Sequence, residues 1–192
     1  METAKEGTGR SNALKREIAI RVEATSRASA EEIYDVLADI GSHLKWAGEM
    51  QRQKNHLLTI EAPEGPAGVG TEFTSTGVAP EGRYTDRSVV TEATRPAAFE
   101  FVTEAHVETK KGKTADLTNI SRYDITPTSE GCRISNTLRI VRASALPGPL
   151  ALMNIRPLAP LVRRDTEGLV GRGLRNLAAV AEERAGRRGK EA

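Results

Sequence analysis

The sequence predicts an α+β fold in which a curved, seven-stranded antiparallel sheet wraps around one long C-terminal helix. An alternating strand pattern comes first, with Ile18, Ile20 and Val22 on one face. Two short helical stretches ending at Trp46 follow, then six strand-like segments, and the last long apolar pattern has helical spacing and closes near Ala185. A sheet that grips a single helix leaves room for a cavity, so we expect function to depend on what fills it.

Composition narrows the class of protein. The 192 residues suit one domain, and a net charge of +2 is too small to indicate a nucleic-acid partner. The single cysteine, Cys132, excludes an internal disulfide and fits a reducing cytoplasm. No stretch resembles a signal peptide, and none approaches the roughly 20 apolar residues of a membrane span. We therefore expect a soluble, cytoplasmic protein without a membrane span.

The pattern of residues 1–46 predicts a tail, a strand and two short helices, in that order. Residues 1–16 are polar and aperiodic, so we expect a disordered tail before a single domain over 17–184, with a charged tail over 185–192. Strict alternation predicts a strand over 17–25. Ser29 has the position of a helix N-cap, and Asp39 could cap a second short turn that ends at Trp46.

Six further strands are predicted, separated by turn-forming glycines and prolines. Their ranges are 52–61, 71–78, 82–92, 97–107, 117–126 and 132–141. This spacing is typical of an antiparallel meander, because short turns join neighbouring strands.

The last segment predicts a long helix. Pro157 and Pro160 should kink or restart it, and its apolar stripe consists of Val162, Leu169, Val170, Leu174, Leu177 and Ala181. The glycines within it (Gly168, Gly171 and Gly173) disfavour a helix by about 1 kcal/mol each. They indicate either close packing of the helix on a strand or space for a ligand.

The order of these elements resembles the START-like (SRPBCC) superfamily, also described as the polyketide cyclase/dehydrase and lipid-transport family. Three stretches carry the resemblance: 28–40 followed by Trp46, 68–73, and 168–177. It implies a helix-grip fold over about 17–184 and a ligand such as a lipid, sterol, plant hormone or polyketide. Some members catalyse cyclisation or dehydration, but the superfamily has no universal catalytic signature to transfer.

Tests for other chemistry are negative. His43, His56 and His106 are dispersed, and the sequence contains neither paired cysteines nor a His-Glu-x-x-His spacing, so we expect no metal and no cofactor. Cys132 has no neighbouring histidine in sequence, which disfavours a nucleophilic role.

Two kinds of side chain are predicted to line the cavity: aromatic residues on the apolar strand faces, and polar residues that lie on the same faces. Ser121, Tyr123 and Asn136 share faces with leucine and isoleucine, so each must bond to protein, water or ligand. Tyr123 is also the candidate catalytic residue, because a phenol is both an apolar wall and a proton donor. Trp46 either fills the core or lies at the cavity mouth. The predicted ligand-binding set is Trp46, Phe73, Phe99, Phe101, Thr103, Ser121, Tyr123, Asn136 and Leu138.

Arg83 and Arg87 lie on the same side of their strand. They face either solvent or the cavity, where they would anchor a carboxylate or an enolate.

Three functions remain open on sequence alone. The first is a binding module for a small hydrophobic or amphipathic molecule such as a lipid, isoprenoid or polyketide. The second is an aromatic cyclase or dehydratase that uses Tyr123, with or without an inward arginine. The third is a protein-interaction domain with a filled core. The first two differ in whether two or more titratable groups meet in the cavity. A homodimer is also open.

Overall fold

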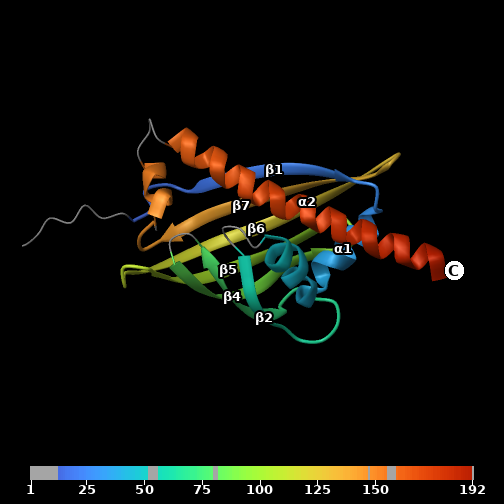
Figure 1. The fold of residues 1–192 in the computed structure, drawn as a ribbon, viewed down its shortest axis with the longest axis horizontal. Helices are drawn as coiled ribbons and strands as arrows, with labels where there is room; N and C mark the ends of the chain where they lie inside the picture. The colour runs from blue at the N-terminus through green and yellow to red at the C-terminus, as the bar shows by residue number, and fades with distance from the viewer. Residues whose placement is uncertain (1–12, 52–55, 80–81, 147, 155–158, 192) are drawn as a thin grey trace, which may run out of the picture.

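The computed structural model describes residues 13–51, 56–79, 82–146, 148–154 and 159–191. Seven strands form one sheet, and the C-terminal helix α2 (Ala159–Glu191) lies across it (Figure 1). The strands are β1 (Ile18–Ser26), β2 (His56–Glu61), β3 (Glu72–Ala79), β4 (Gly82–Thr94), β5 (Ala98–Thr109), β6 (Thr114–Thr128) and β7 (Gly131–Ala143). The predicted helix-grip α+β fold is therefore confirmed.

The sheet is antiparallel throughout, in the order β1-β7-β6-β5-β4-β3-β2. β2 to β7 form the predicted meander, while β1 pairs with β7, the last strand in sequence. The pairing of first and last strands leaves β1 and β2 at the two edges, and α2 makes most of its sheet contacts with β1.

Helix α1 (Ala30–Ala38) begins at the predicted cap. The backbone N–H of Glu32 donates to Ser29 Oγ at 3.2 Å, and the Glu32 carboxylate accepts from the Ser29 N–H at 2.8 Å. This reciprocal pair satisfies two N–H groups that the first helical turn leaves without a partner.

The segment after α1 differs from the expected short turn. It divides into a 3-10 helix (Ile40–Ser42), a π-helical turn (Leu44–Gly48) and a second 3-10 turn (Glu49–Gln51). The side chain of Asp39 does not cap it, contrary to expectation, and instead accepts a hydrogen bond from Arg184 of α2 at 2.8 Å. The Asp39 carboxylate, which the local sequence pattern predicts as a cap, therefore forms an ion pair with Arg184 of α2 instead.

The strands match the predicted ones closely, with longer hairpin ends. β6 starts three residues before the predicted Leu117, because Thr114 and Ala115 pair with the end of β5. β2 is described from His56 onward, and the predicted residues 52–55 lie outside the described part of the chain.

The two ends of the domain also differ from expectation. A 3-10 helix (Gly148–Asn154) precedes α2, Pro160 lies in the first turn of α2 and Pro157 is outside the described residues. α2 continues past Ala185 to Glu191. At the other end, the Leu14 N–H donates to the Ala143 carbonyl at 3.2 Å, so this part of the predicted tail contacts β7.

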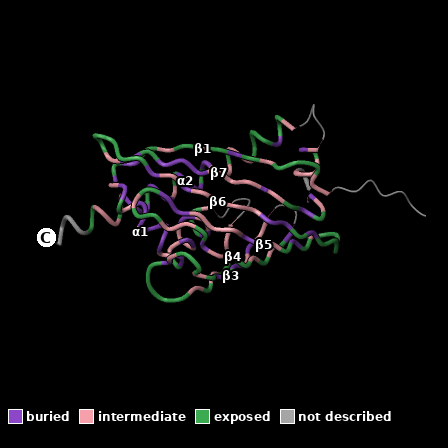
Figure 2. The backbone as a smooth tube through the Cα atoms, turned by 180° about the vertical axis from the view of Figure 1, so that it is seen from behind, coloured by how far each residue is buried: buried purple, intermediate pink, exposed green. Residues whose placement is uncertain are grey.

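The main hydrophobic core lies between α1, α2 and the inner face of the sheet. Its fully buried members include Ile33, Leu37, Phe99, Leu177 and Ala181. Figure 2 shows buried residues recurring along α2 and along the central strands beneath it. Within the described residues, no helix is both long and apolar enough to cross a membrane.

Candidate functional site

A cavity of about 240 Å³ lies between the inner face of the sheet, α2 and the helical segment 40–51. All of the strands from β2 to β7 contribute side chains to its wall. On the α2 side it is lined by Leu169, Val170, Gly173 and Leu174.

Strand alternation explains which sheet residues reach this wall. Side chains two residues apart share a face, and cross-strand pairing places Ser88 opposite Thr103, Phe101 opposite Ser121, and Tyr123 opposite Asn136. The cavity wall is therefore built from a block of neighbouring inward positions on adjacent strands.

One part of the wall is aromatic. The rings of His43 and Trp46 have centroids 4.7 Å apart, Phe73 and Phe101 meet edge to face at 5.5 Å, and Phe101 stacks on Tyr123 at 6.3 Å. These distances are in the favourable range for aromatic pairs, so the rings support one another as a firm surface. Trp46 is buried in the hydrophobic core and also lines the cavity, while its predicted place at the cavity mouth stays a prediction.

His43 is held by the fold in a neutral form. Its Nε2–H donates to the carbonyl oxygen of Leu37 at 2.8 Å. Burial is the main reason that its pKa falls from 6.5 to about 4. His43 therefore contributes an uncharged ring to the wall at neutral pH.

Another part of the wall is polar and includes Asp86. Ser75 Oγ donates to Asp86 Oδ2 over a long 3.4 Å, while Asp86 Oδ1 is buried and has no hydrogen-bond partner among the described residues. Burial raises the pKa of Asp86 from 3.8 to about 7. His56 and Tyr84 line the same region, and the Nδ1 of His56 is likewise buried without a partner among the described residues.

Arg83 and Arg87 face solvent on the outer side of β4. Both are exposed, and Arg87 Nη2 pairs with Glu72 Oε2 at 2.8 Å. The possibility that they anchor a carboxylate inside the cavity is therefore wrong. Because their side chains point outward, the intervening Tyr84, Asp86 and Ser88 point inward.

Eight of the nine predicted ligand-binding residues line the cavity. They are Trp46, Phe73, Phe101, Thr103, Ser121, Tyr123, Asn136 and Leu138. Phe99 does not, since it is fully buried and packs edge to face on Tyr34 of α1 at 5.9 Å. Whether these residues contact a ligand stays a prediction.

Two of the polar residues in that set already have protein partners. Thr103 Oγ1 and Ser88 Oγ lie 2.9 Å apart, and Asn136 Nδ2 donates to the Arg122 carbonyl at 3.1 Å. The Tyr123 hydroxyl makes no hydrogen bond with the described residues, and burial raises its pKa, so the phenol stays protonated.

Sequence reasoning missed the acidic end of the cavity. Ser75, Tyr84, Asp86 and Ser88 were not singled out, although the alternation around Arg83 and Arg87 contains the necessary signal. Gly173 also lines the cavity, and a Cβ atom there would lie 2.6 Å from Gln51 Nε2. Gly173 thus packs closely on the 3-10 turn Glu49–Gln51 instead of on a strand, and whether it makes space for a ligand stays a prediction.

The described part of the chain contains neither a group of side chains suited to a metal ion nor a reactive thiol. No group of three or more histidine, cysteine, aspartate or glutamate side chains is placed to hold a metal ion there. Cys132 is a buried free thiol whose pKa is raised by burial to about 11, so it is not ionised at neutral pH.

Comparison with solved structures supports the fold. The protein TTHA0849 of Thermus thermophilus has a TM-score of 0.57 at 17% identity, covering 86% of this chain and 98% of its own. Mll3558 of Rhizobium loti has a TM-score of 0.57 at 15% identity, covering 85% and 96%. Ara h 8.0201 has a TM-score of 0.53 at 12% identity, covering 87% and 99%. At these identities the likeness concerns the fold alone.

Sequence comparison places the chain in a family. No curated protein sequence matches it. The profile of the family described as "Polyketide cyclase / dehydrase and lipid transport" matches residues 17–182, which is most of the chain and includes every strand and most of α2. Together with the helix-grip fold, this match makes the protein a member of the polyketide cyclase/dehydrase and lipid-transport family.

Proposed function

We propose that this protein binds a compact hydrophobic or amphipathic molecule in the cavity between the sheet and α2. The observation that carries the proposal is the cavity itself, with its wall of Trp46, Phe73, Phe101 and Tyr123 facing the apolar side chains of α2. Concave, mostly apolar sites with a few polar groups are typical of small-molecule binding. A protein-interaction domain with a filled core is less well supported, because this interior is not filled.

The size of the cavity limits the ligand. Drug-sized ligands occupy pockets of about 300–1,000 Å³, so a cavity of about 240 Å³ suits something smaller. It equals the liquid volume of about eight water molecules. A molecule with one or two rings, or a short branched chain, fits this space, whereas a lipid with two long acyl chains does not.

Native mass spectrometry tests the proposal directly. The protein is purified without detergent and its mass is compared before and after extraction with organic solvent. We expect an added mass of a small organic molecule that extraction removes. A sample without added mass that also fails to take up a panel of small aromatic and aliphatic compounds contradicts the proposal.

A cavity-filling substitution adds a structural control. Thr103→Trp should fill the cavity and abolish uptake, because Thr103 is buried on its wall. Val102→Trp lies on the opposite face of β5, where the side chain is partly exposed, and should leave uptake unchanged. Equal uptake by the two variants would mean that the ligand lies elsewhere.

A cyclase or dehydratase activity is the second candidate, and one observation favours it. Several titratable side chains line the same cavity, among them Tyr84, Asp86 and Tyr123. Because burial keeps the Tyr123 phenol protonated, its role would be to donate a hydrogen bond to a carbonyl oxygen of the substrate. Enzyme-dependent deuterium exchange at the methyl group of acetophenone, lost in Tyr123→Phe, would support this activity. Exchange that Tyr123→Phe leaves intact would exclude the assigned role.

A cytoplasmic location and a homodimer also stay proposals. The single buried thiol of Cys132 supports the first, because a reducing compartment preserves it. Cell fractionation and analytical ultracentrifugation test the two separately.

A further inference from the structure

One group of polar side chains in the cavity comes from three adjacent strands, β2, β3 and β4. Pairing places Ser75 of β3 opposite Asp86 of β4, and the next inward pair is Gly77 opposite Tyr84. His56 lies at the start of β2, where β2 pairs with the same part of β3. The cavity thus has one polar wall, and the aromatic side chains of the helical segment and of β5 and β6 form another.

Asp86 has too few hydrogen bonds for a buried carboxylate. An ionised carboxylate offers about four acceptor sites. Here one oxygen has a single donor, Ser75 Oγ at 3.4 Å, which is at the long limit for a hydrogen bond, and the other has none among the described residues. Buried polar groups are nearly always paired in folded proteins, so this deficit indicates a missing partner.

No described side chain forms an ion pair with Asp86, although His56 lines the same part of the cavity wall. The described residues that line the cavity include neither lysine nor arginine. The nearest arginines in sequence, Arg83 and Arg87, lie on the outer face of the same strand. His43 is neutral because of its burial and its bond to Leu37. No ion pair within the described wall therefore balances a negative charge on Asp86.

We propose that the ligand is a compact primary amine, whose ammonium group donates hydrogen bonds to the Asp86 carboxylate while its apolar body lies on the aromatic wall. This inference rests on the proposed function and specifies the chemical class of the ligand. Charge-assisted hydrogen bonds are the strongest that a carboxylate makes, and an ammonium supplies three donors.

The same geometry ranks other ligand classes below an amine. An alcohol provides one uncharged donor to Asp86, so it forms a weaker bond. A carboxylate ligand would bring a second negative charge beside Asp86 and would meet no described cation. Burial raises the pKa of Asp86 to about 7, and a cation bound beside it would lower this pKa by stabilising the ionised form.

Four probes with nearly the same skeleton test the inference: phenethylamine, phenethyl alcohol, phenylacetate and propylbenzene. Binding is measured at pH 7.5 by calorimetry and by the fluorescence of Trp46, which is the single tryptophan of the chain and lines the cavity. We expect the amine to bind about tenfold or more tightly than the alcohol, and phenylacetate to bind more weakly than either.

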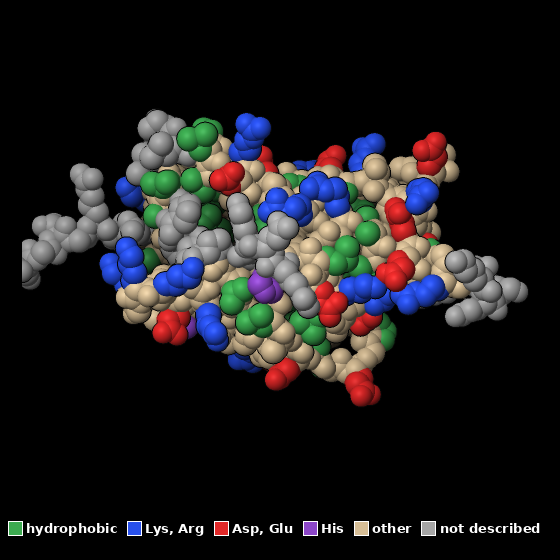
Figure 3. All heavy atoms as spheres, viewed as in Figure 1, with side chains coloured by type: hydrophobic (Ala, Val, Ile, Leu, Met, Phe, Trp, Pro, Cys, Tyr) green, Lys and Arg blue, Asp and Glu red, His purple; other side chains and the backbone are tan. Residues whose placement is uncertain are grey.

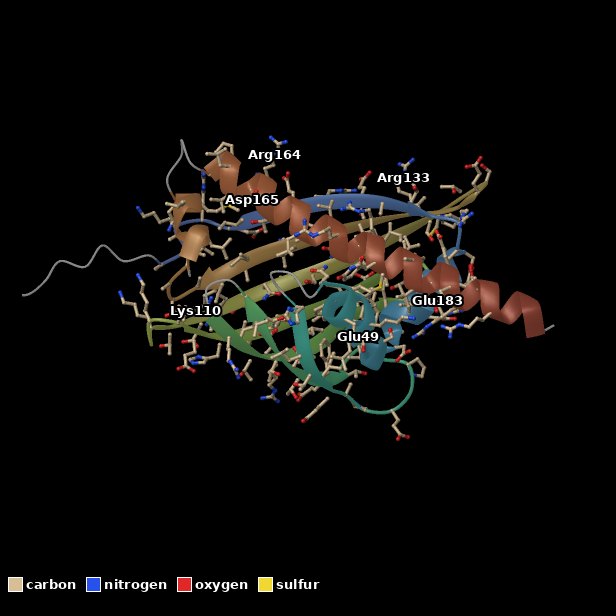
Figure 4. The ribbon with its side chains drawn as sticks, viewed as in Figure 1. Glu49, Lys110, Arg133, Arg164, Asp165 and Glu183 are labelled. Carbon is tan, nitrogen blue, oxygen red and sulfur yellow. The ribbon has the colours of Figure 1, made fainter. Side chains whose placement is uncertain are left out.

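Two variants separate the role of Asp86 from its effect on folding. Asp86→Asn keeps the shape of the side chain and should remove the preference for the amine while binding of propylbenzene is retained. Asp165→Asn changes the same residue type at an exposed position on α2 and should leave all four affinities unchanged (Figure 4). Circular dichroism and thermal unfolding verify that each variant is folded.

The results distinguish this inference from the proposed function. Two results would overturn the amine proposal while leaving the cavity as a ligand site. In the first, propylbenzene binds but phenethylamine binds no more tightly than phenethyl alcohol. In the second, Asp86→Asn still binds phenethylamine more tightly than phenethyl alcohol. Tightest binding of the alcohol or of phenylacetate also overturns the amine proposal. If none of the four probes binds, and Thr103→Trp takes up the same small molecules as wild type in native mass spectrometry, both the amine proposal and the proposed function fail.

Discussion

Asp86 and His43 line the same cavity, and burial shifts their pKa values in opposite directions. The pKa of Asp86 rises from 3.8 to about 7, and that of His43 falls from 6.5 to about 4. In both cases the folded protein favours the uncharged form, because a charge inside the cavity loses its hydration. As a result, proton binding at these two groups changes the free energy of unfolding with pH in opposite directions.

The first prediction concerns stability against pH. Between pH 4 and 6.5 the folded state binds the extra proton at Asp86, so this group makes stability fall as pH rises. At His43 the unfolded state binds the extra proton, so this group makes stability rise with pH in the same window. The two contributions oppose each other, each by up to about 1.4 kcal/mol per pH unit.

Substitution should therefore reveal each linkage. Relative to wild type, Asp86→Asn should gain stability as pH rises from 4 to 6.5, while His43→Gln should lose it. Glutamine retains an N–H donor for the Leu37 carbonyl. Urea unfolding at several pH values measures both. Variants whose stability difference from wild type is independent of pH would contradict the assigned shifts.

A second prediction concerns the cap of α1. Ser29→Ala should lower the free energy of unfolding by about 1 kcal/mol, because the Glu32 N–H loses its acceptor. Glu32→Gln is the matched control, since glutamine can still accept from the Ser29 N–H. Chemical denaturation should show a clearly smaller loss for the control, and equal losses would argue against the capping box.

A third prediction uses two glycines of α2. Gly168→Ala should raise the free energy of unfolding by about 0.5–1 kcal/mol, because alanine favours the helix and its Cβ meets nothing within 4 Å. Gly173→Ala should gain less, since its Cβ would press on Gln51 Nε2 at the cavity wall. Ligand uptake should change only in Gly173→Ala. A change of uptake in Gly168→Ala would contradict this division.

A fourth prediction concerns the contact of β3 with β4. The Tyr84 ring lies so close to Gly77 that a Cβ there would be 2.2 Å from the Tyr84 oxygen and 2.6 Å from the His56 carbonyl oxygen. Gly77→Ala should therefore destabilise the protein by about 2 kcal/mol or more. Adding Tyr84→Ala should not restore stability, because the backbone contact with His56 persists. Thermal unfolding of the single and double variants tests this expectation.

The surface agrees with the modest net charge. Acidic and basic side chains are mixed over the face that carries α2 (Figure 3). Many charged side chains of the protein form exposed ion pairs, such as Arg139 with Glu17 at 2.7 Å and Lys45 with Glu183 at 2.6 Å. Exposed ion pairs of this kind contribute little to the free energy of unfolding. The predictions on charge therefore concern groups in the cavity.

The sequence by itself determined the order of elements, the cap at Ser29 and the inward or outward direction of most strand residues. These follow from local rules: hydrogen-bonding side chains at helix starts, and alternation with a period of two in strands. The same rule was sufficient to place Phe101 and Thr103 on one face of their strand, and it would have placed Asp86 inward once Arg83 and Arg87 were taken as exposed.

Only the tertiary structure decided which inward side chains border empty space. Phe99 and Phe101 have the same direction on β5, yet α1 packs on Phe99 while Phe101 lines the cavity. Ser88 and Asp86 also share a face, yet Thr103 pairs with Ser88 and no described residue pairs with Asp86 Oδ1. The direction of a side chain is set by its own strand, whereas its neighbours are set by how the sheet curves and where distant helices pack on it.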